Sequence, residues 1–354
     1  MKNNIENIRI IKILVFSLGC IGLVSVMALD KLYWGTSILA EGWPDFSPGH
    51  ITRSIIIFIS LLAIFWSVVG NSRQKFRLDE GGGLPLEQLS ILGVAFISVV
   101  ILFFFILAPS IFNALSLEDG VIEWGSAMLL FSSCAITAIS FSKSRNVLNI
   151  QKDTQLSLAL LAFVFFVMAM EEVSWFQRVL EIETPKVFDA NLQHEMNLHN
   201  FYTNPIENIY YNGAFLFLVV LPFVRLIYPC ISNNSYLRIF VARPFIGVIG
   251  AIACAYNFDM WNIIFTQIAF FGSVLILFAF FVRSSHRNEK YITSFTILLV
   301  ITTQVLFLFN GENFSRYWEV TEYKEFFIPL ALFIYSLDVF AYMKKRAAVT
   351  NDAY

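Results

Sequence analysis

The residues best suited to chemistry in this sequence are carboxylates and histidines grouped around positions 171 and 199. Glu171 and Glu172 stand side by side at the end of an apolar run. Charges there are costly unless they are paired, protonated or bound to a metal. Glu195 and His199 are four positions apart, so a helix would turn both side chains the same way. That spacing lets two side chains ligate one metal ion, or lets a carboxylate orient an imidazole for acid–base work.

This grouping predicts a site for a divalent metal, either zinc, iron or manganese. The ligands and acid–base groups would be Glu171, Glu172, Glu195 and His199. Such an ion lowers the pKa of a bound water and supplies hydroxide for attack on an ester, amide or phosphoester. A structural interpretation stays open. The paired glutamates can instead hold the bundle together through Arg178, Trp175 or Ser174, and the second pair can belong to a loop helix capped by Asn191.

Four further residues are candidates for binding a substrate. Glu123 lies inside an apolar run and must face the bundle or a wet cavity. Arg178 and Arg316 can anchor a phosphate or carboxylate. At helical spacing Trp175 shares one face with Glu171, Ser174 and Arg178, whereas Glu172 points elsewhere.

The elements that must position these residues are membrane helices. Hydrophobic residues make up 57% of the 354 residues and charged residues 14%, and mean hydropathy is +0.68. This composition predicts an all-α, polytopic membrane bundle. The net charge of −2 argues against a nucleic-acid-binding protein, which would be basic. Four scattered cysteines without CxxC spacing suggest neither a disulfide framework nor a zinc knuckle.

Ten apolar runs have roughly the length that a membrane crossing needs. They are Ile10–Leu29, Ile55–Gly70, Leu89–Ala108, Val121–Phe141, Leu156–Met170, Ile209–Ile227, Pro244–Phe258, Ile263–Val282, Tyr291–Phe309 and Phe326–Met343. We therefore expect about ten spans, with residues 1–354 forming one integral membrane domain. The seventh run is short, and with the eighth it could form a re-entrant hairpin instead of a crossing.

The basic residues predict how the bundle is oriented. Alternate junctions between the runs carry 18 of the 24 Lys and Arg residues, and the other junctions carry six. Under the positive-inside rule both termini are cytoplasmic. The outer junctions and outer helix ends hold 18 of the 26 acidic residues, a surplus that a cation or metal would offset. The outer loop 177–207 is expected to carry a short polar helix.

Part of this region resembles a known family. The segments Glu171-Glu172-Val173-Ser174-Trp175-x-Gln177-Arg178, Glu183-Thr184-Pro185 and Asn191-x-Gln193-x-Glu195-x-Asn197-x-His199-Asn200 resemble a family of uncharacterised bacterial multi-pass membrane proteins. That pattern has glycine after the tryptophan, where this chain has Phe176. The resemblance implies a bacterial inner membrane and no particular activity. In arrangement, the chain is also similar to ceramidase-type membrane hydrolases, which hold a metal within a helical bundle.

These features predict a metal-dependent hydrolase or transferase that acts on a lipid or lipid-linked substrate at the exoplasmic face. A polyprenyl-linked glycan polymerase or transferase is an alternative, and it would use Arg178 and Arg316 for pyrophosphate. A cation transporter with an acidic outer vestibule is another, and it would depend on Glu123 or on Asp338, which lies near the middle of the last run. The absence of an internal repeat weighs against transport. A purely structural role in an envelope assembly also stays open.

Overall fold

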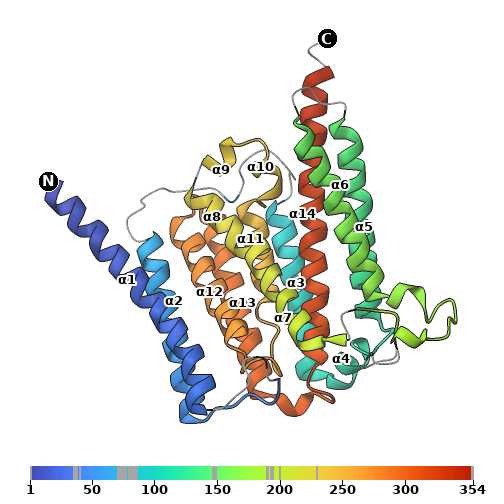
Figure 1. Ribbon diagram of the computed structural model, residues 1–354, viewed down its shortest axis with the longest axis horizontal. Helices are drawn as coiled ribbons and strands as arrows, with labels where there is room; N and C mark the ends of the chain where they lie inside the picture. Colours follow the sequence, from blue (N-terminus) through green and yellow to red (C-terminus); the bar gives the residue numbers. More distant parts are fainter. Residues whose placement is uncertain are drawn as a thin grey trace.

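The computed structural model of the protein is a row of long helices that run in alternating directions (Figure 1). The structure describes residues 2–34, 39, 41–69, 78, 87–145, 150–188, 191, 195–198, 201–228 and 230–351. Among these residues no strand is found. Helices α1 and α2 lie at one edge of the row and α5 and α6 at the other, and both termini lie at the same end of the bundle.

Nine helices in the described part of the chain are long and apolar enough to cross a membrane. They are α1 (Lys2–Leu29), α2 (Pro48–Val69), α3 (Glu87–Leu107), α5 (Val121–Ser144), α6 (Lys152–Glu172), the continuous run α7 (Thr203–Phe215), η5 (Leu216–Val220) and α8 (Leu221–Ile227), α12 (Ile264–Arg283), α13 (Arg287–Phe309) and α14 (Glu319–Asn351). The prediction of an all-helical chain with many membrane-length apolar helices is confirmed. Shorter elements are η1 (Asp30–Trp34), α4 (Pro109–Leu115), η2 (Ser174–Phe176), η3 (Lys186–Phe188), α9 (Cys230–Asn233), α10 (Leu237–Phe240), α11 (Pro244–Ala253) and η6 (Gly311–Asn313).

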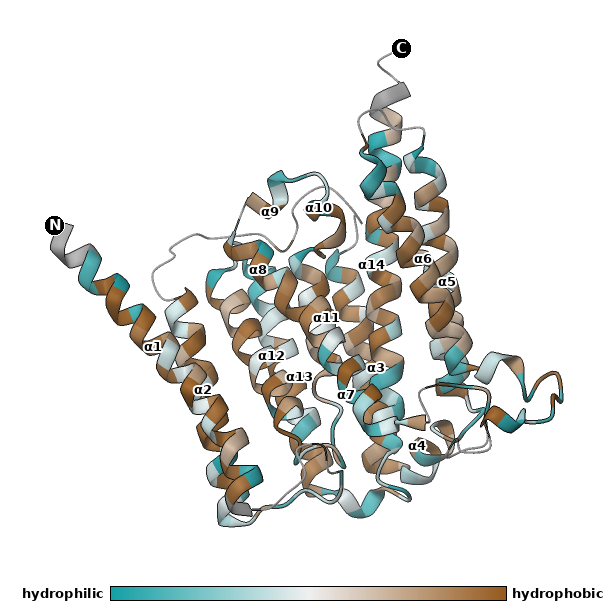
Figure 2. Cartoon of the chain, in the orientation of Figure 1, coloured by the Kyte–Doolittle hydropathy of each residue, from teal (hydrophilic) through white to brown (hydrophobic). Residues whose placement is uncertain are grey.

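Hydropathy explains which helices are central. Apolar residues cover the long helices and polar residues gather near their ends (Figure 2). Only 11% of the apolar window of α1 is buried inside the protein, against 61% for α12 and for α14. The apolar side chains that α1 exposes suit a lipid environment, whereas α12 and α14 are packed on most sides by other helices.

The seventh predicted run is a short helix followed by irregular backbone. Helix α11 ends at Ala253, and residues 254–263 continue without forming a regular helix. Every residue from Val241 to Trp261 is buried. The segment begins beside Glu87, the first residue of α3, and reaches Asn262, beside the start of α2. It therefore passes from one end of the bundle to the other inside the protein.

The irregular stretch finds its hydrogen-bond partners among protein side chains, as backbone shielded from water requires. Asn257 Nδ2 donates to Cys254 O (2.8 Å), Gln304 Nε2 to Asn257 O (2.7 Å), Gln267 Nε2 to Trp261 O (3.0 Å) and Arg53 Nη2 to Asn262 O (2.6 Å). These donors come from α2, α12, α13 and the stretch itself. The non-helical conformation is therefore held by three neighbouring helices.

A buried ion-pair cluster fixes the start of α11. Arg243 Nε lies 2.9 Å from Asp338 Oδ2, and Arg243 Nη1 lies 2.9 Å from Glu87 Oε1. The cluster joins α3, α11 and α14, and all three side chains are less than a tenth exposed. Removing one member would leave buried charge without its partner, so the cluster stabilises the packing of these three helices.

Close backbone contact between α11 and η5 gives a first testable prediction. A Cβ atom added at Gly250 would lie 2.7 Å from Leu218 Cβ, whereas one added at Gly93 of α3 meets nothing within 4 Å. We expect Gly250→Ala to lower stability by about 1–3 kcal/mol relative to Gly93→Ala, because overpacking forces side chains and backbone to shift. Thermal unfolding midpoints in detergent would measure the difference. Equal midpoints for the two variants would contradict this packing.

Candidate functional site

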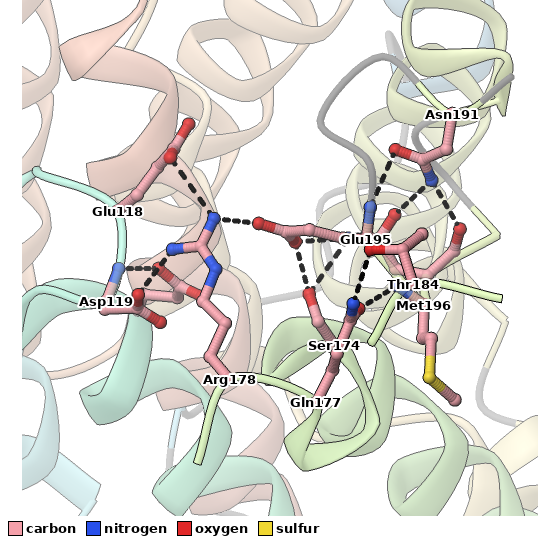
Figure 3. A network of polar contacts seen from close by, with 11 residues as sticks. Glu118, Asp119, Ser174, Gln177, Arg178, Thr184, Asn191, Glu195 and Met196 are labelled. Carbon is pink, nitrogen blue, oxygen red and sulfur yellow. Dashed lines mark hydrogen bonds and ion pairs between the residues drawn. The ribbon is translucent and has the colours of Figure 1, made fainter. Parts of the chain in front are cut away.

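A polar network joins the end of α6 to the following loop, and Arg178 is its centre (Figure 3). The Arg178 guanidinium contacts the carboxylates of Glu118, at 3.3 Å, Asp119 and Glu195. Glu195 is only 7% exposed, and Ser174 Oγ also donates to it. Partial burial of Arg178 disfavours its charge and lowers its pKa. The hydrogen bond to Asp119 and the negative charge of Glu195 outweigh this effect and raise the pKa above its usual value for arginine. The guanidinium therefore stays charged and acts as a permanent counter-ion.

Neutral hydrogen bonds also hold distant parts of the loop after α6 to one another. Gln177 Oε1 accepts from the Met196 backbone N–H at 2.6 Å, and Gln177 Nε2 donates to Thr184 Oγ1 at 2.9 Å. Asn191 Nδ2 donates to the Asn197 carbonyl at 2.8 Å. Among the described residues of this loop, 177–188, 191 and 195–198 form 3₁₀ turns and irregular backbone, and helix α7 begins at Thr203. Residues 192–194, 199 and 200 lie outside the described residues, so the short polar helix predicted in this loop stays a prediction.

Helix α6 ends in a left-handed turn that the sequence reasoning did not foresee. Ser174, Trp175 and Phe176 have φ values of 44°, 54° and 58°, a backbone region that residues other than glycine rarely occupy. The helical face predicted to carry Glu171, Trp175 and Arg178 together does not form, because the helix stops at Glu172. Trp175 Nε1 nevertheless donates to Glu171 Oε1 at 2.8 Å. Strain of this kind persists only where the surroundings fix the backbone.

The structure divides the predicted metal-binding set. Glu171 Oε2 accepts from the Leu198 backbone N–H at 2.6 Å, and Glu195 is held by Arg178 and Ser174. Glu172 has different neighbours, since its electrostatic partners include Glu322 and Glu325 of α14. His199 lies outside the described residues. No group of three His, Cys, Asp or Glu side chains that could hold a metal is found within the described ranges, and the metal site stays a prediction.

The other predicted binding residues already have protein partners. Glu123 Oε2 accepts from the backbone N–H of Asp119, which lies just before the start of α5, at 2.6 Å. Arg316 Nη2 donates to the Ser116 carbonyl at 2.9 Å, and its Nε lies 3.6 Å from Glu319. Arg316 lies three residues before Glu319, the first residue of α14, and so precedes the helix.

A second polar site lies deeper, between α7, η5, α11, α12 and α14. Between these elements lies a small pocket of about 20 Å³, enough for one water molecule. Its polar wall includes Lys324, Asn257 and Tyr211, and its apolar wall includes Phe215, Leu218 and Ile328. Polar and apolar side chains thus meet around this small space.

Lys324 is the central charge of this pocket. Its side chain is 5% exposed, its Nζ donates to Asn257 Oδ1, and the ammonium lies 4.5 Å from the centre of the Tyr211 ring. Tyr211 Oη in turn donates to Glu325 Oε1 at 2.6 Å. The carboxylates of Asp259, Glu207 and Glu325 all act electrostatically on the ammonium. A buried amine, a phenol and carboxylates are thus gathered at one point of the bundle.

Two departures from regular helix create the pocket. The run from α7 to α8 contains the π-helical segment η5, which contributes Leu218 to the wall. Helix α11 stops at Ala253, and both Ala253 and Cys254 line the pocket. π-helical segments are frequent at functional sites, and a helix C-terminus carries partial negative charge that favours a cation such as Lys324.

Sequence reasoning missed this pocket, although one signal for it was present. Lys324 was counted among the outer basic residues because the last apolar run was expected to begin at Phe326. Helix α14 begins at Glu319, so Lys324 and Glu325 lie within a membrane-length helix. An ionisable residue directly beside an apolar run is a candidate functional residue.

Comparison with protein-family models, curated proteins and solved structures finds no match for the chain. The family resemblance around residues 171–200 therefore stays a prediction, and function has to be inferred from the chemistry of this chain's own side chains.

The Arg178 network gives a second testable prediction. We expect Arg178→Gln to destabilise the protein by about 1–3 kcal/mol, because Glu195 would remain buried without its counter-ion. Lys186→Gln is the matched control, since it removes the same charge from an exposed position of the same loop. Thermal unfolding in detergent measures both variants. Adding Glu195→Gln to Arg178→Gln should restore part of the lost stability. If the network does not stabilise the protein, neither the loss nor the recovery will be observed.

Proposed function

We propose that the protein is an integral membrane hydrolase or transferase that acts on a lipid or lipid-linked substrate at the exoplasmic face. The observation that carries the proposal is the pocket between α7, α11, α12 and α14, which combines an apolar wall with a buried amine and a tyrosine–glutamate pair. Acid–base groups beside a cation inside an apolar pocket are what acyl or phosphoryl chemistry on an amphiphile requires.

The proposed exoplasmic location rests on the basic residues. Lys324 lies near the start of α14, at the end of the bundle opposite the two termini (Figure 1). The junctions at the termini's end carry the larger share of Lys and Arg, which favours a cytoplasmic location for them. A bacterial inner membrane is proposed from the family resemblance around residues 171–200.

Each group in the pocket has a chemical role in this proposal. The hydrocarbon part of the substrate lies against Phe215, Leu218 and Ile328, and Lys324 stabilises negative charge that develops on the reacting oxygen. Tyr211, hydrogen-bonded to Glu325, transfers the proton between the attacking or leaving oxygen and that carboxylate. Water as the acceptor gives hydrolysis, and a second lipid or sugar hydroxyl gives transfer.

The divalent metal remains a separate part of the proposal. Glu171 and Glu195 already accept hydrogen bonds, so a metal ion would have to displace those donors, whereas Glu172 faces other carboxylates. Such an ion, held by Glu172 and His199, would supply a hydroxide nucleophile.

Cation transport is the second candidate, and the broken crossing segment favours it. Transport sites often lie where helices are interrupted inside the membrane, as α11 is at Ala253. Glu207 and Glu325, which act electrostatically on each other, would then bind the cation. In this alternative Lys324 moderates the affinity of the site.

Turnover of membrane lipid is the direct test of the enzymatic proposal. Purified protein in liposomes of bacterial polar lipids, supplemented with a polyprenyl-phosphate fraction, should form new lipid species detectable by mass spectrometry. We expect Lys324→Met to slow this turnover by about 10²–10³-fold, because it removes a group that stabilises developing charge. Tyr211→Phe should slow it by about 10²-fold or more through loss of proton transfer.

Lys345→Met is the matched control, because it removes an exposed lysine near the other end of α14 and should leave turnover unchanged. Equal turnover by the Lys324 and Lys345 variants, at equal folded yield, would contradict the role of the pocket. Folded wild-type protein that converts no lipid, but carries sodium ions or protons across liposomes in a Glu325-dependent manner, would establish the second candidate instead.

Bound metal is tested separately from turnover. Protein purified without a histidine tag should contain near-stoichiometric zinc, iron or manganese by mass spectrometry. The Glu172→Ala/His199→Ala double variant should lose that metal, because both proposed ligands are removed. A wild-type protein that converts lipid without bound metal would remove the metal from the mechanism and leave the pocket residues in place.

A further inference from the structure

The loop that follows α6 exposes a group of aliphatic side chains. Val179, Leu180, Ile182 and Val187 are between 42% and 78% exposed, and all four fall within residues 179–187, which form the apolar loop segment. Exposed apolar surface is costly in water, and a group of such side chains marks a place where a protein meets another molecule or a membrane. The apolar loop segment therefore requires a partner other than water.

The length of α6 places this segment at the membrane boundary. Helix α6 has 21 residues and at 1.5 Å per residue is about 31 Å long, close to the roughly 30 Å of hydrocarbon in a bilayer. Its first and last residues, Lys152 and Glu172, are charged, so the chain enters the headgroup region directly after the helix. The loop then projects sideways from the edge of the row and does not extend past the lower ends of α13 and α14 (Figure 1). Its outward side chains therefore lie beside lipid, at the level of the headgroups.

The apolar loop segment continues the lipid-facing surface of α5 and α6. These helices form one edge of the row, and Val121 and Met128 of α5 and Phe163 of α6 are 62–68% exposed. Arg178, which directly precedes the segment, contacts Asp119, two residues before the start of α5. The exposed start of α5 and the segment thus lie close together, and the same bilayer covers both.

Hydrogen bonds hold the segment in this exposed position. The Gln177 carbonyl accepts from the Ile182 backbone N–H at 3.0 Å, and the Gln177 side chain donates to Thr184 Oγ1 at 2.9 Å. A loop that is already ordered loses little conformational entropy when it meets its partner. The fold itself therefore presents these aliphatic side chains to lipid.

The charges of the segment indicate how deeply it inserts and which lipids it needs. Glu181, Glu183 and Lys186 are all exposed, so the segment carries two acidic side chains and one basic side chain. The carboxylates stay among the headgroups, because charge inside hydrocarbon is costly, and this limits insertion to the boundary. Recognition of anionic lipid uses clusters of Lys and Arg, which residues 179–187 do not contain. Contact with the membrane therefore depends on apolar burial and not on lipid charge.

We infer that the apolar loop segment is a membrane-interface anchor, which inserts Leu180 and Val187 at the boundary between headgroups and hydrocarbon. The segment lies at the end of the bundle opposite the two termini, which is the outer leaflet under the positive-inside rule. Insertion fixes the end of α6 and the Arg178 network relative to the membrane surface. The inference is independent of the proposed function, since an enzyme and a transporter would both use such an anchor.

Site-specific photo-crosslinking of the full-length protein in liposomes tests the inference. A diazirine amino acid is placed at position 180 or 187, and mass spectrometry after irradiation measures the fraction of protein joined to a phospholipid. Leu160, exposed on α6, is the lipid-facing reference. Ala348 is the water-facing reference, because it is exposed near the end of α14, whose 33 residues exceed the length of a crossing.

Both loop positions should give lipid adducts. We expect yields close to that at Leu160 and at least about fivefold above that at Ala348, because the inserted side chains contact acyl chains and headgroups. Phosphatidylcholine liposomes with and without phosphatidylglycerol should give equal yields, because the segment has no basic cluster.

Variants matched in charge assign the adducts to the aliphatic side chains. With the diazirine at position 182, Leu180→Asp/Val187→Asp should lower the lipid-adduct yield by at least about fivefold, because carboxylates do not enter the boundary. Lys186→Asp is the matched control, since it changes the charge of the same loop equally and removes no aliphatic side chain. It should keep the yield within about twofold. All three substituted positions are exposed, so neither variant removes packing inside the protein.

Three results would overturn the inference. Loop adducts no more frequent than those at Ala348 would show that the segment faces water. Adducts mainly to a second copy of the chain would make the segment a subunit interface instead. Yields that require phosphatidylglycerol, or that fall equally in the double variant and in Lys186→Asp, would show that charge and not apolar contact holds the loop at the membrane.

Discussion

Irregular backbone in the interior of a membrane bundle is stable only if the protein itself supplies its hydrogen-bond partners. Residues 254–263 impose that constraint here, and side chains from three other helices meet it. Arg53 of α2, Gln267 of α12 and Gln304 of α13 each donate to a carbonyl of this stretch. The relative positions of those helices therefore depend on a segment that is itself only partly helical. At its other end, the buried Arg243 cluster ties the same segment to α3 and α14.

The pocket is a consequence of this arrangement. Because α11 stops at Ala253, the volume that its next turns would occupy is shared between irregular backbone and open space. The π-helical segment η5 faces the same space, and Gly250 lets the two elements approach closely enough to form one wall. Lys324 then lies where a helix end attracts positive charge and where Asn257 offers an acceptor. Fold and site thus share one origin, the early end of α11.

Hydropathy predicted the helices well because crossing a membrane is a local property of about twenty residues. Nine of the ten predicted runs correspond to long apolar helices in the described chain. Details that depend on tertiary structure were not predictable in the same way. The helical face expected after Glu172 is replaced by left-handed backbone at Ser174, Trp175 and Phe176. Glycine is the residue that tolerates this conformation best, and because the chain has none at these three positions, its residue types do not indicate the turn.

The two polar sites differ in a way that bears on their roles. In the outer network, Arg178, Glu195, Gln177 and Asn191 direct their polar groups to one another and to the loop backbone. A network satisfied in this way rigidifies the end of α6 and so fixes where Glu172 meets α14. Around Lys324, by contrast, the ammonium has three N–H groups, of which one is directed to Asn257, and it lies beside a small pocket. A ligand can bind only where the protein has donors or acceptors that can still form hydrogen bonds. For this reason the deeper pocket is a better candidate for chemistry than the residues around Arg178.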